Sequence, residues 1–169
     1  MEAKRCCFTG HRNIDLSLLL PLTAHLDAAL RALVQVGCLH FYAGGARGFD
    51  TLAAERTLAL RESCPAVSLH LLLPCRDQHR SWSAEDAEHY EQILARADSY
   101  RYISEAYSPA AMAKRNRALV ASADVCIAFL RKEASGTGQT VRAARGKGLT
   151  VINLADRLPL PGTTLSYTR

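Results

Sequence analysis

Short apolar runs alternate with stretches of helical periodicity along most of the chain. In the stretch from about Leu16 to Val36, for example, Leu22, Leu26 and Leu30 recur at the spacing of one helix face. Each shorter apolar run has the length of a β-strand. The predicted strands are Arg5–Phe8, Leu39–Ala43, Val67–Leu73, Ser99–Ile103, Asp124–Leu130 and Thr150–Leu154.

Helices are predicted between these strands, over about 16–36, 51–61, 84–96, 109–123 and within 136–148. We expect Pro21 to divide an entry turn from the main first helix, Gly37 to end that helix, and Asp50 or Thr51 to cap the second. The run Asp124–Leu130 is apolar throughout, which favours a strand buried on both faces. Alternation of this kind predicts an α/β fold, a Rossmann-like three-layer sandwich with a mainly parallel sheet.

The length of 169 residues predicts a single domain over 1–169, with a core from about 5 to 154 and an irregular tail over 157–169. The first residues lead straight into a strand without a signal-peptide pattern, and no apolar run is long enough to predict a membrane span. Six cysteines are present, and none form a C-x-x-C pair or a known ligand spacing. We therefore expect a cytoplasmic, reduced protein with no membrane contact and no metal site.

The formal net charge is +5 and the pI is about 9.0. A mildly basic chain suits an anionic small ligand or a nucleic acid. The basic residues are scattered along the predicted helices, and no concentrated basic stripe is interleaved with aromatic residues. A nucleic-acid partner is therefore not expected.

Glycine or charged residues follow four of the predicted strands at the point where each ends. These turns are 9–12, 44–50, 74–76 and 135–138. The carboxyl ends of parallel strands share one edge of the sheet, so turns that are distant in sequence should meet in one crevice. Glycine lets backbone N–H groups approach a ligand, and the following helix directs the positive end of its dipole there. The pattern predicts a seat for a phosphate-bearing ligand.

The turn after the second strand carries three glycines, Gly44, Gly45 and Gly48, around Arg47. One interpretation is an anion cradle of backbone N–H groups and a guanidinium group. The other is a tight turn that ends in a helix cap at Asp50. Both known glycine-rich phosphate motifs, G-x-G-x-x-G and G-x-x-x-x-G-K-[ST], are absent, and position alone does not decide.

Several single residues allow two interpretations each. His11 is a candidate acid or base, or a donor that orients a ligand, and the second is favoured because no nucleophile stands beside it. Arg12 is placed to contact an anion. Glu55, on a helix of small residues, either reaches a ribose hydroxyl or faces water, and Trp82 either stacks on a base or packs as a lid.

The loop 134–140 repeats the pattern after the strongest strand. Ser135, Thr137 and the backbone there either donate to phosphate oxygens or form an ordinary capped helix start. The basic cluster Lys114–Arg117 lies inside a predicted helix, where its three cations cannot share one face, so one or two of them must be solvated.

Taken in order, these short motifs resemble the YpsA-like branch of the SLOG superfamily, which also contains the LOG proteins and the DNA-processing protein DprA. The resemblance runs from about residue 5 to residue 154. It rests on Phe8–Arg12, Ala43–Asp50 with Ala53–Glu55, Pro74, Trp82, Arg115-Asn116, Ser122-x-Asp124, and Ser135–Thr137 with Thr140-Val141.

The resemblance implies a Rossmann-like fold that binds a nucleotide-derived ligand such as ADP-ribose, NAD or an AMP-like nucleotide. Related proteins often form dimers, so a homodimer is one expected state. Carried over by position, the ligand-binding residues are Gly10, His11, Arg12, Gly44, Gly45, Arg47, Gly48, Asp50, Glu55, Arg115, Asn116, Ser135, Gly136 and Thr137.

The chain departs from the family pattern at two positions. Ser135 stands where the family usually has the first glycine of Gly-Gly-Thr, which removes some backbone freedom and adds a hydroxyl group. The LOG enzymes carry P-G-G-x-G-T-x-x-E, and Thr140 falls at the position of that glutamate. The resemblance therefore does not carry phosphoribohydrolase activity to this chain.

Three hypotheses follow, in decreasing order of support. The first is a ligand sensor or regulatory protein that binds a nucleotide derivative. The second is a hydrolase of an N-glycosidic or phosphate bond, with His11, Asp50 and Glu55 as acid or base candidates. The third is a nucleic-acid binder like DprA.

Overall fold

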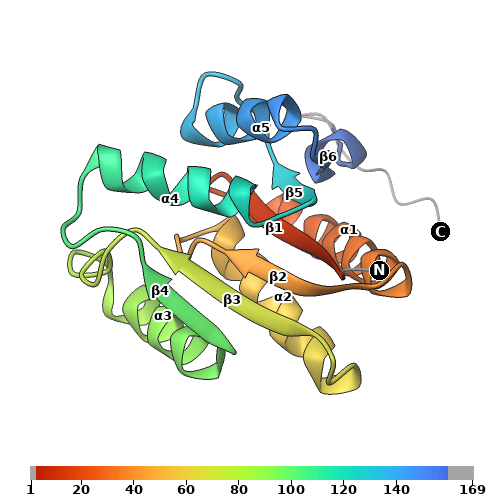
Figure 1. Ribbon diagram of the computed structural model, residues 1–169, viewed down its shortest axis with the longest axis horizontal. Coiled ribbons are helices and arrows are strands. Elements are labelled where there is room, and N and C mark those ends of the chain that lie inside the picture. The colour runs from red at the N-terminus through yellow and green to blue at the C-terminus, as the bar shows by residue number, and fades with distance from the viewer. Residues whose placement is uncertain (1–2, 160–169) are drawn as a thin grey trace.

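Six parallel strands form one sheet, in the order β4-β3-β2-β1-β5-β6, in the computed structural model, which describes residues 3–159. Its all-parallel α/β arrangement confirms the predicted fold class (Figure 1). The strands are β1 (Lys4–Gly10), β2 (Cys38–Ala43), β3 (Ser68–Leu73), β4 (Ser99–Tyr102), β5 (Val125–Phe129) and β6 (Thr150–Asn153). The helices are α1 (Leu16–Gln35), α2 (Phe49–Ser63), α3 (Ala84–Arg96), α4 (Pro109–Ala121), α5 (Gly136–Gly146) and the short 3₁₀ helix η1 (Leu154–Arg157).

Helices cover both faces of the sheet and divide its core in two. Alternate residues of β1 point to opposite faces, as a strand requires. Phe8 belongs to the larger cluster with α1, α2 and α3, while Cys7 belongs to the cluster with α4 and α5. Every residue of β5 is buried, which confirms the strand predicted to be covered on both faces.

The chain reverses its direction of travel across the sheet at one place. From β1 it proceeds through β2 and β3 to the edge strand β4, and then returns to β5 on the other side of β1. The connections after β1 and β5 therefore diverge to opposite faces of the sheet. This divergence leaves a crevice at the carboxyl ends of these two strands, which is where open parallel sheets bind ligands.

The prediction that Pro21 divides the first helix was wrong. The helix α1 is continuous from Leu16 to Gln35. The proline removes a single backbone donor near the helix start, and burial of Leu22 and Leu26 on the same helix outweighs that loss. Gly37 ends the helix region with a positive φ of 87°, as expected.

The cap of α2 also differs from the prediction. The N-cap is Gly48, and α2 begins at Phe49, so Asp50 is already inside the first turn. The carboxylate of Asp50 instead accepts a hydrogen bond from the backbone N–H of Ala46, at 3.2 Å, earlier in the same turn. This hydrogen bond stabilises the turn before α2 and does not cap the helix.

The helix α1 is long and apolar enough by length and composition to cross a membrane, contrary to the expectation that no segment would be. Core helices of soluble proteins meet the same criterion, and α1 buries Leu22, Leu26 and Leu30 against the sheet. Of the predicted tail, Arg157 lies in η1 and Leu158 is buried in the core; residues 160–169 lie outside the described part of the chain.

The conformation of Gly48 should make it the least replaceable residue of the turn before α2. Its φ of 77° and ψ of −121° lie where only glycine is comfortable, and an added Cβ would collide with the Arg12 backbone. We expect Gly48→Ala to lower the free energy of unfolding by at least about 3 kcal/mol.

Gly37→Ala is the matched control for this substitution. Gly37 also has a positive φ, but nothing lies within 4 Å of its added Cβ. Its replacement should cost only about 1 kcal/mol in urea-induced unfolding. Equal losses in the two variants would contradict the close approach of Arg12 to Gly48.

Candidate functional site

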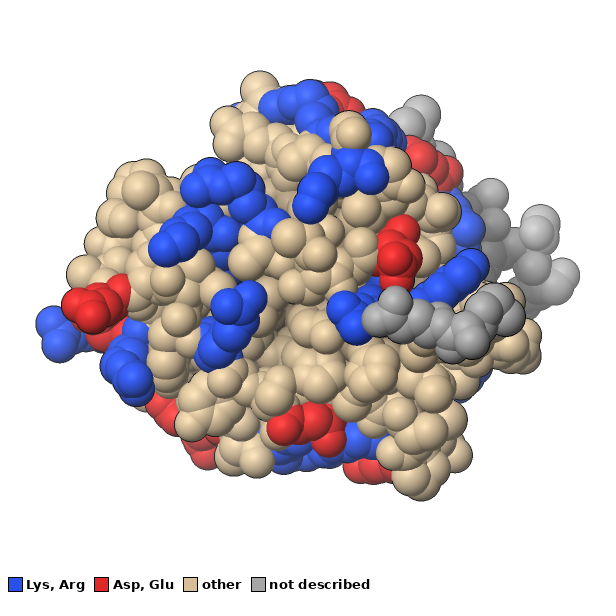
Figure 2. Space-filling view, viewed as in Figure 1, with Lys and Arg blue, Asp and Glu red and all other residues tan. Residues whose placement is uncertain are grey.

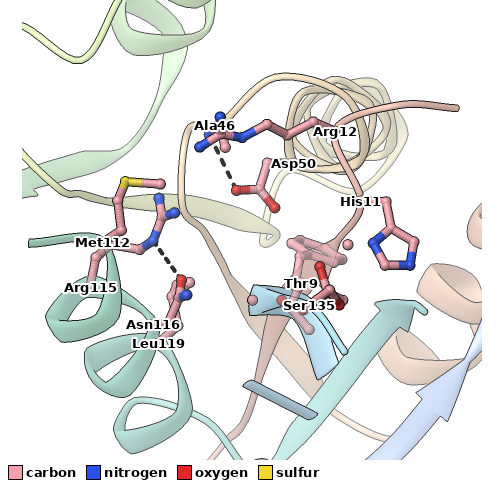
Figure 3. Close-up of a pocket in the computed structure, with 14 residues that line it drawn as sticks. Thr9, His11, Arg12, Ala46, Asp50, Met112, Arg115, Asn116, Leu119 and Ser135 are labelled. Atoms are coloured by element: carbon pink, nitrogen blue, oxygen red, sulfur yellow. Dashed lines mark hydrogen bonds between the residues drawn. The ribbon is translucent and has the colours of Figure 1, made fainter. Parts of the chain in front are cut away.

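A cavity of about 300 Å³ lies at the carboxyl end of β1, where the sheet order reverses. Figure 3 shows Arg12 and Asp50 on one side of it, Arg115 and Asn116 on another, and His11 and Ser135 opposite. Three of the four predicted turns supply its wall, and α4 supplies the rest. The lining residues are Phe8, Thr9, Gly10, His11, Arg12, Ala46, Asp50, Met112, Arg115, Asn116, Leu119, Ser135, Gly136 and Thr137.

His11 ties the surrounding turns together through its backbone and its ring. Its backbone N–H donates to the carbonyl of Phe129 at the end of β5, at 3.3 Å, and its carbonyl accepts from the N–H of Phe49 at the start of α2, at 3.1 Å. Its Nε2 accepts from the backbone N–H groups of Arg131, at 2.8 Å, and Lys132, at 3.1 Å. One residue thus fixes the loop after β5 relative to the turn after β1.

These contacts define the protonation state of the imidazole. A nitrogen that accepts two N–H bonds carries no proton, so Nε2 is the bare nitrogen and Nδ1 is the donor. Partial burial lowers the pKa of His11, and the nearby Lys132 ammonium group lowers it further. His11 is a neutral positioning group whose Nδ1–H remains available, which favours the orienting interpretation over the acid–base one.

Two buried charged residues, Asp50 and Arg115, lie close together around Gly44 at the cavity wall. Asp50 is 6% exposed and Arg115 is 3% exposed. Burial raises the pKa of Asp50, while the charge of Arg115 opposes that shift; burial likewise lowers the pKa of Arg115, and Asp50 opposes it. The Arg115 guanidinium donates from Nη1 to the carbonyl of Gly44 and from Nε to Oδ1 of Asn116, the latter at 2.8 Å.

The prediction that the cluster Lys114–Arg117 cannot share one face is confirmed. Lys114 and Arg117 are exposed, whereas Arg115 is buried and Asn116 is half-buried at the cavity. Met112 and Leu119, which the sequence interpretation missed, lie three and four residues from Arg115. That helical spacing was a signal that would have placed them on the same face of α4.

The N-terminus of α5 forms the opposite wall. Ser135 is its N-cap, and the hydroxyl group accepts from the N–H of Gly138 at 3.0 Å and donates to the carbonyl of Lys132 at 2.6 Å. Its φ of −152° is extended backbone that any residue adopts, so the serine needs no glycine conformation here. The backbone N–H groups of Gly136 and Thr137, in the first turn, have no acceptor within the helix.

The glycines of the second turn lie behind the cavity wall rather than on it. An added Cβ on Gly44 would lie 2.8 Å from Cζ of Arg115 and 2.9 Å from Oδ2 of Asp50. Gly45 lies close to Leu73, and Gly48 lies against Arg12. These residues admit the neighbouring side chains that shape the site, whereas only Ala46 and Asp50 of this turn reach the cavity itself.

The predicted residues Arg47 and Glu55 do not line this cavity. Glu55 is exposed on α2, and its nearest ionic partner is His89, with Oε1 and Nδ1 3.9 Å apart. Arg47 extends to Trp82, whose ring centroid is 5.2 Å from its Cζ. Trp82 also makes edge contacts with Tyr90 and His79, so it packs on the domain surface and borders a second cavity.

Thr140 occupies the position of the LOG glutamate. It is 4% exposed, and its Oγ1 donates to the carbonyl of Gly136 at 3.0 Å. The side chain is therefore engaged within α5 and offers no carboxylate to the cavity.

The model of the YspA SLOG family matches residues 6–147, which include all of this site. The chain belongs to the YspA SLOG family. A curated relative, a UPF0398 protein of Bacillus pumilus, is 29% identical over 138 residues, which cover 76% of this chain and 74% of the relative. A UPF0398 protein of Bacillus thuringiensis is 28% identical over 126 residues, with 73% and 68% covered.

Two solved structures share the fold of this SLOG protein. One is DNA processing protein A of Helicobacter pylori, described in a single-stranded DNA binding mode, with a TM-score of 0.62 and 20% identity. The other is DprA of Streptococcus pneumoniae, with a TM-score of 0.65 and 16% identity. Each match covers 88% of this chain, but only 63% and 49% of the respective DprA chains.

The contacts of His11 in this SLOG domain lead to a prediction about pH. Its pKa is lowered on folding, so the folded protein binds that proton less tightly than the unfolded chain, whose histidine has a pKa of about 6.5. The free energy of unfolding should therefore decrease as the pH falls below about 6.5, until the pH passes below the lowered pKa.

His11→Gln should flatten this dependence, because the amide oxygen can accept at the Nε2 position but does not titrate there. Urea unfolding of both proteins across this pH range provides the measurement. His70, whose pKa is lowered by burial and by His40, contributes equally to both and leaves a residual slope. Identical pH profiles would show that the imidazole does not lose the loop contacts on protonation.

Proposed function

We propose that this protein binds a nucleotide-derived ligand, such as ADP-ribose, NAD or an AMP-like nucleotide, in the cavity at the β1–β5 crevice. It would act as a sensor or regulatory protein. The supporting observation is that one cavity combines the N-terminus of α5, two arginines and a buried carboxylate at the place where parallel sheets bind ligands.

The wall formed by α5 suits a phosphate group. The N–H groups of Gly136 and Thr137 are free to donate, and the helix dipole adds a positive field at the same place. Arg12, exposed at the edge of the cavity, adds a full charge. A phosphate oxygen there would accept from backbone and guanidinium donors together.

The opposite wall suits a sugar. One carboxylate oxygen of Asp50 accepts from Ala46, and the other points toward the middle of the cavity (Figure 3). Asn116 lies across from it, with its Oδ1 already accepting from Arg115. A carboxylate oxygen accepts from a ribose hydroxyl group and repels a phosphate, and an amide NH₂ can donate to the hydroxyl oxygen.

A binding role has more support than hydrolysis. Of the three acid or base candidates, His11 is neutral and holds a loop, and Glu55 is outside the cavity wall. Asp50 remains, with an opposing Arg115 and a pKa raised by burial. Thr140 supplies no carboxylate in place of the LOG glutamate.

Nucleic-acid binding is the second candidate, and the fold shared with DprA favours it. The net charge of +5 has the right sign. Figure 2 shows Lys and Arg in separate groups, parted mainly by uncharged surface, on the face that carries α4 and α5, rather than in one stripe. This distribution gives a strand of nucleic acid no continuous track, so the small ligand remains the leading proposal.

Gly136→Asp should weaken ligand binding without loss of stability. An added Cβ at Gly136 meets nothing within 4 Å, and an aspartate in a first helical turn is favourable for the helix. Its charge would oppose a phosphate in the cavity and weaken binding of ADP-ribose or AMP by about tenfold or more. Calorimetry and thermal shift measure both properties.

Gly136→Asn is the control, because it has the same size without the charge. It should bind ADP-ribose or AMP within a few-fold of the original chain. The proposal fails if none of ADP-ribose, NAD and AMP binds the original protein, or if the aspartate variant binds them unchanged.

The nucleic-acid alternative is tested with a short oligothymidylate in gel-shift assays. If it were the main ligand, its affinity would fall steeply between about 50 and about 200 mM salt and would decrease in Lys114→Ala and Arg117→Ala, which alter exposed cations on α4. We expect instead that the oligonucleotide binds more weakly than ADP-ribose at each salt concentration.

A further inference from the structure

A second cavity, of about 280 Å³, adjoins the first. It lies between the turn after β2 and the loop that leads from β3 to α3. Three residues, Arg12, Ala46 and Met112, line both cavities, so the two share a wall at which Arg12 is the charged group. The remaining lining residues are Arg47, Asp77, Gln78, Arg80, Ser81, Trp82 and Tyr107.

The second cavity is strongly basic. Arg12, Arg47 and Arg80 contribute three guanidinium groups, against a single carboxylate from Asp77. Within residues 3–159, the ion pairs involve other arginines. Arg12 lies near enough to Asp50 to oppose the rise in pKa that burial causes in that carboxyl group, but it forms no direct ion pair with it. Arginines gathered without internal partners are typical of a site that binds an anion.

Arg47 is held at the wall by packing rather than by hydrogen bonds. Its guanidinium lies over Trp82, and its Nε is buried without a hydrogen-bond partner in the structure. Trp82 is in turn fixed by ring contacts with Tyr90, at 5.5 Å, and His79, at 6.2 Å. A buried donor without an acceptor destabilises the protein, so packing on Trp82 rather than hydrogen bonding holds Arg47 at this wall.

The outer wall offers a free aromatic surface. Tyr107, at the start of α4, is 55% exposed and borders the cavity. An exposed ring next to guanidinium groups is the combination on which nucleobases stack. The chemistry of this cavity therefore differs from that of the first, in which the only Phe, Tyr or Trp on the wall is the fully buried Phe8.

We propose that the second cavity binds the other half of a two-part nucleotide, in which two nucleoside or sugar units are joined by a diphosphate. This inference rests on the proposed function. One ribose half occupies the first cavity, the bridging diphosphate extends from the N-terminus of α5 toward Arg12 at the shared wall, and the second unit lies between Arg80 and Tyr107. Such a ligand uses both cavities, whereas AMP reaches only the first.

The sizes of the cavities agree with this assignment. Each one alone is at or just below the lower end of the range for small-molecule sites, roughly 300 to 1,000 Å³. Together they fall well inside it. The shared wall consists of Ala46 and two long side chains, those of Arg12 and Met112. Because long unbranched side chains can change rotamer, a ligand can extend from the first cavity into the second.

Trp82 provides a direct test, because it is the single tryptophan in the chain and borders only the second of these cavities. Titration with ADP-ribose should change its fluorescence, while saturation with AMP, followed in parallel by calorimetry, should leave it unchanged. ADP-ribose should bind the original chain at least about tenfold more tightly than AMP.

Arg80→Ala and Tyr107→Leu should each weaken ADP-ribose binding, the arginine variant by about tenfold, and leave AMP binding unchanged. Both residues are exposed, so the variants should fold. Arg76→Ala is the matched control: Arg76 is an exposed arginine of the same loop, lies 4.5 Å from the ring of Tyr102, and lines neither cavity. It should bind both ligands normally.

Two outcomes would overturn the second subsite while leaving the proposed function intact. One is equal binding of ADP-ribose and AMP with no effect of Arg80→Ala. The other is Arg80-dependent binding of a short oligothymidylate that exceeds the binding of ADP-ribose, which would assign the second cavity to nucleic acid. Failure of every nucleotide to bind would overturn both proposals together.

Discussion

The arrangement of the site depends on one imidazole ring that accepts two backbone hydrogen bonds. Nε2 of His11 satisfies the N–H groups of Arg131 and Lys132, which follow β5 and have no sheet partner to satisfy them. The backbone of His11 also bonds to Phe129 and Phe49. The start of α2 and the loop before α5 are therefore held at fixed positions relative to each other. A cavity between three separate turns keeps its shape only if such a connection exists, since loops alone are held by few contacts.

The second constraint is the pair of buried charges, Asp50 and Arg115. Either charge alone at a buried position would destabilise the protein, because desolvation disfavours the charged form of both groups. Their hydrogen bonds to Ala46, Gly44 and Asn116 leave each group partly satisfied by the protein, with some capacity directed at the cavity. The site is therefore preorganised at the expense of stability, which is the pattern expected where a ligand completes a polar network.

The sequence predicted the sheet well because its signals are local. Apolar runs and helical spacing identified the six strands and the five α-helices within a few residues, although not the short η1. The strand β5 stood out because a strand covered on both faces has no polar positions. The N-terminus of α5 and the group Gly10, His11 and Arg12 were also found, since they follow strand ends directly. Five lining residues were missed. All except Thr9 have apolar side chains, and their place at the cavity depends on packing between elements: Phe8, Thr9, Ala46, Met112 and Leu119.

The glycine-rich turn after β2 shows that a motif can identify a region of the site without fixing the role of each residue. Its glycines suggested N–H groups directed at an anion, yet they mainly make room for Arg115, Asp50 and the Arg12 backbone. A glycine in a sequence indicates only that another group approaches the backbone closely. A single sequence does not show whether that group belongs to a ligand or to the protein itself. Here the neighbours are charged groups of the site.

The chain shares its fold with DprA at 16–20% identity, so the likeness establishes architecture and leaves the ligand to be argued from the cavity. Two substitutions bear on that argument. Ser135 caps the start of α5 with its own hydroxyl group, so this turn does not need a glycine at that position. The hydroxyl group of Thr140 bonds within the helix. The start of α5 therefore presents backbone N–H groups and no carboxylate to the cavity, which is the arrangement that the proposed binding role requires.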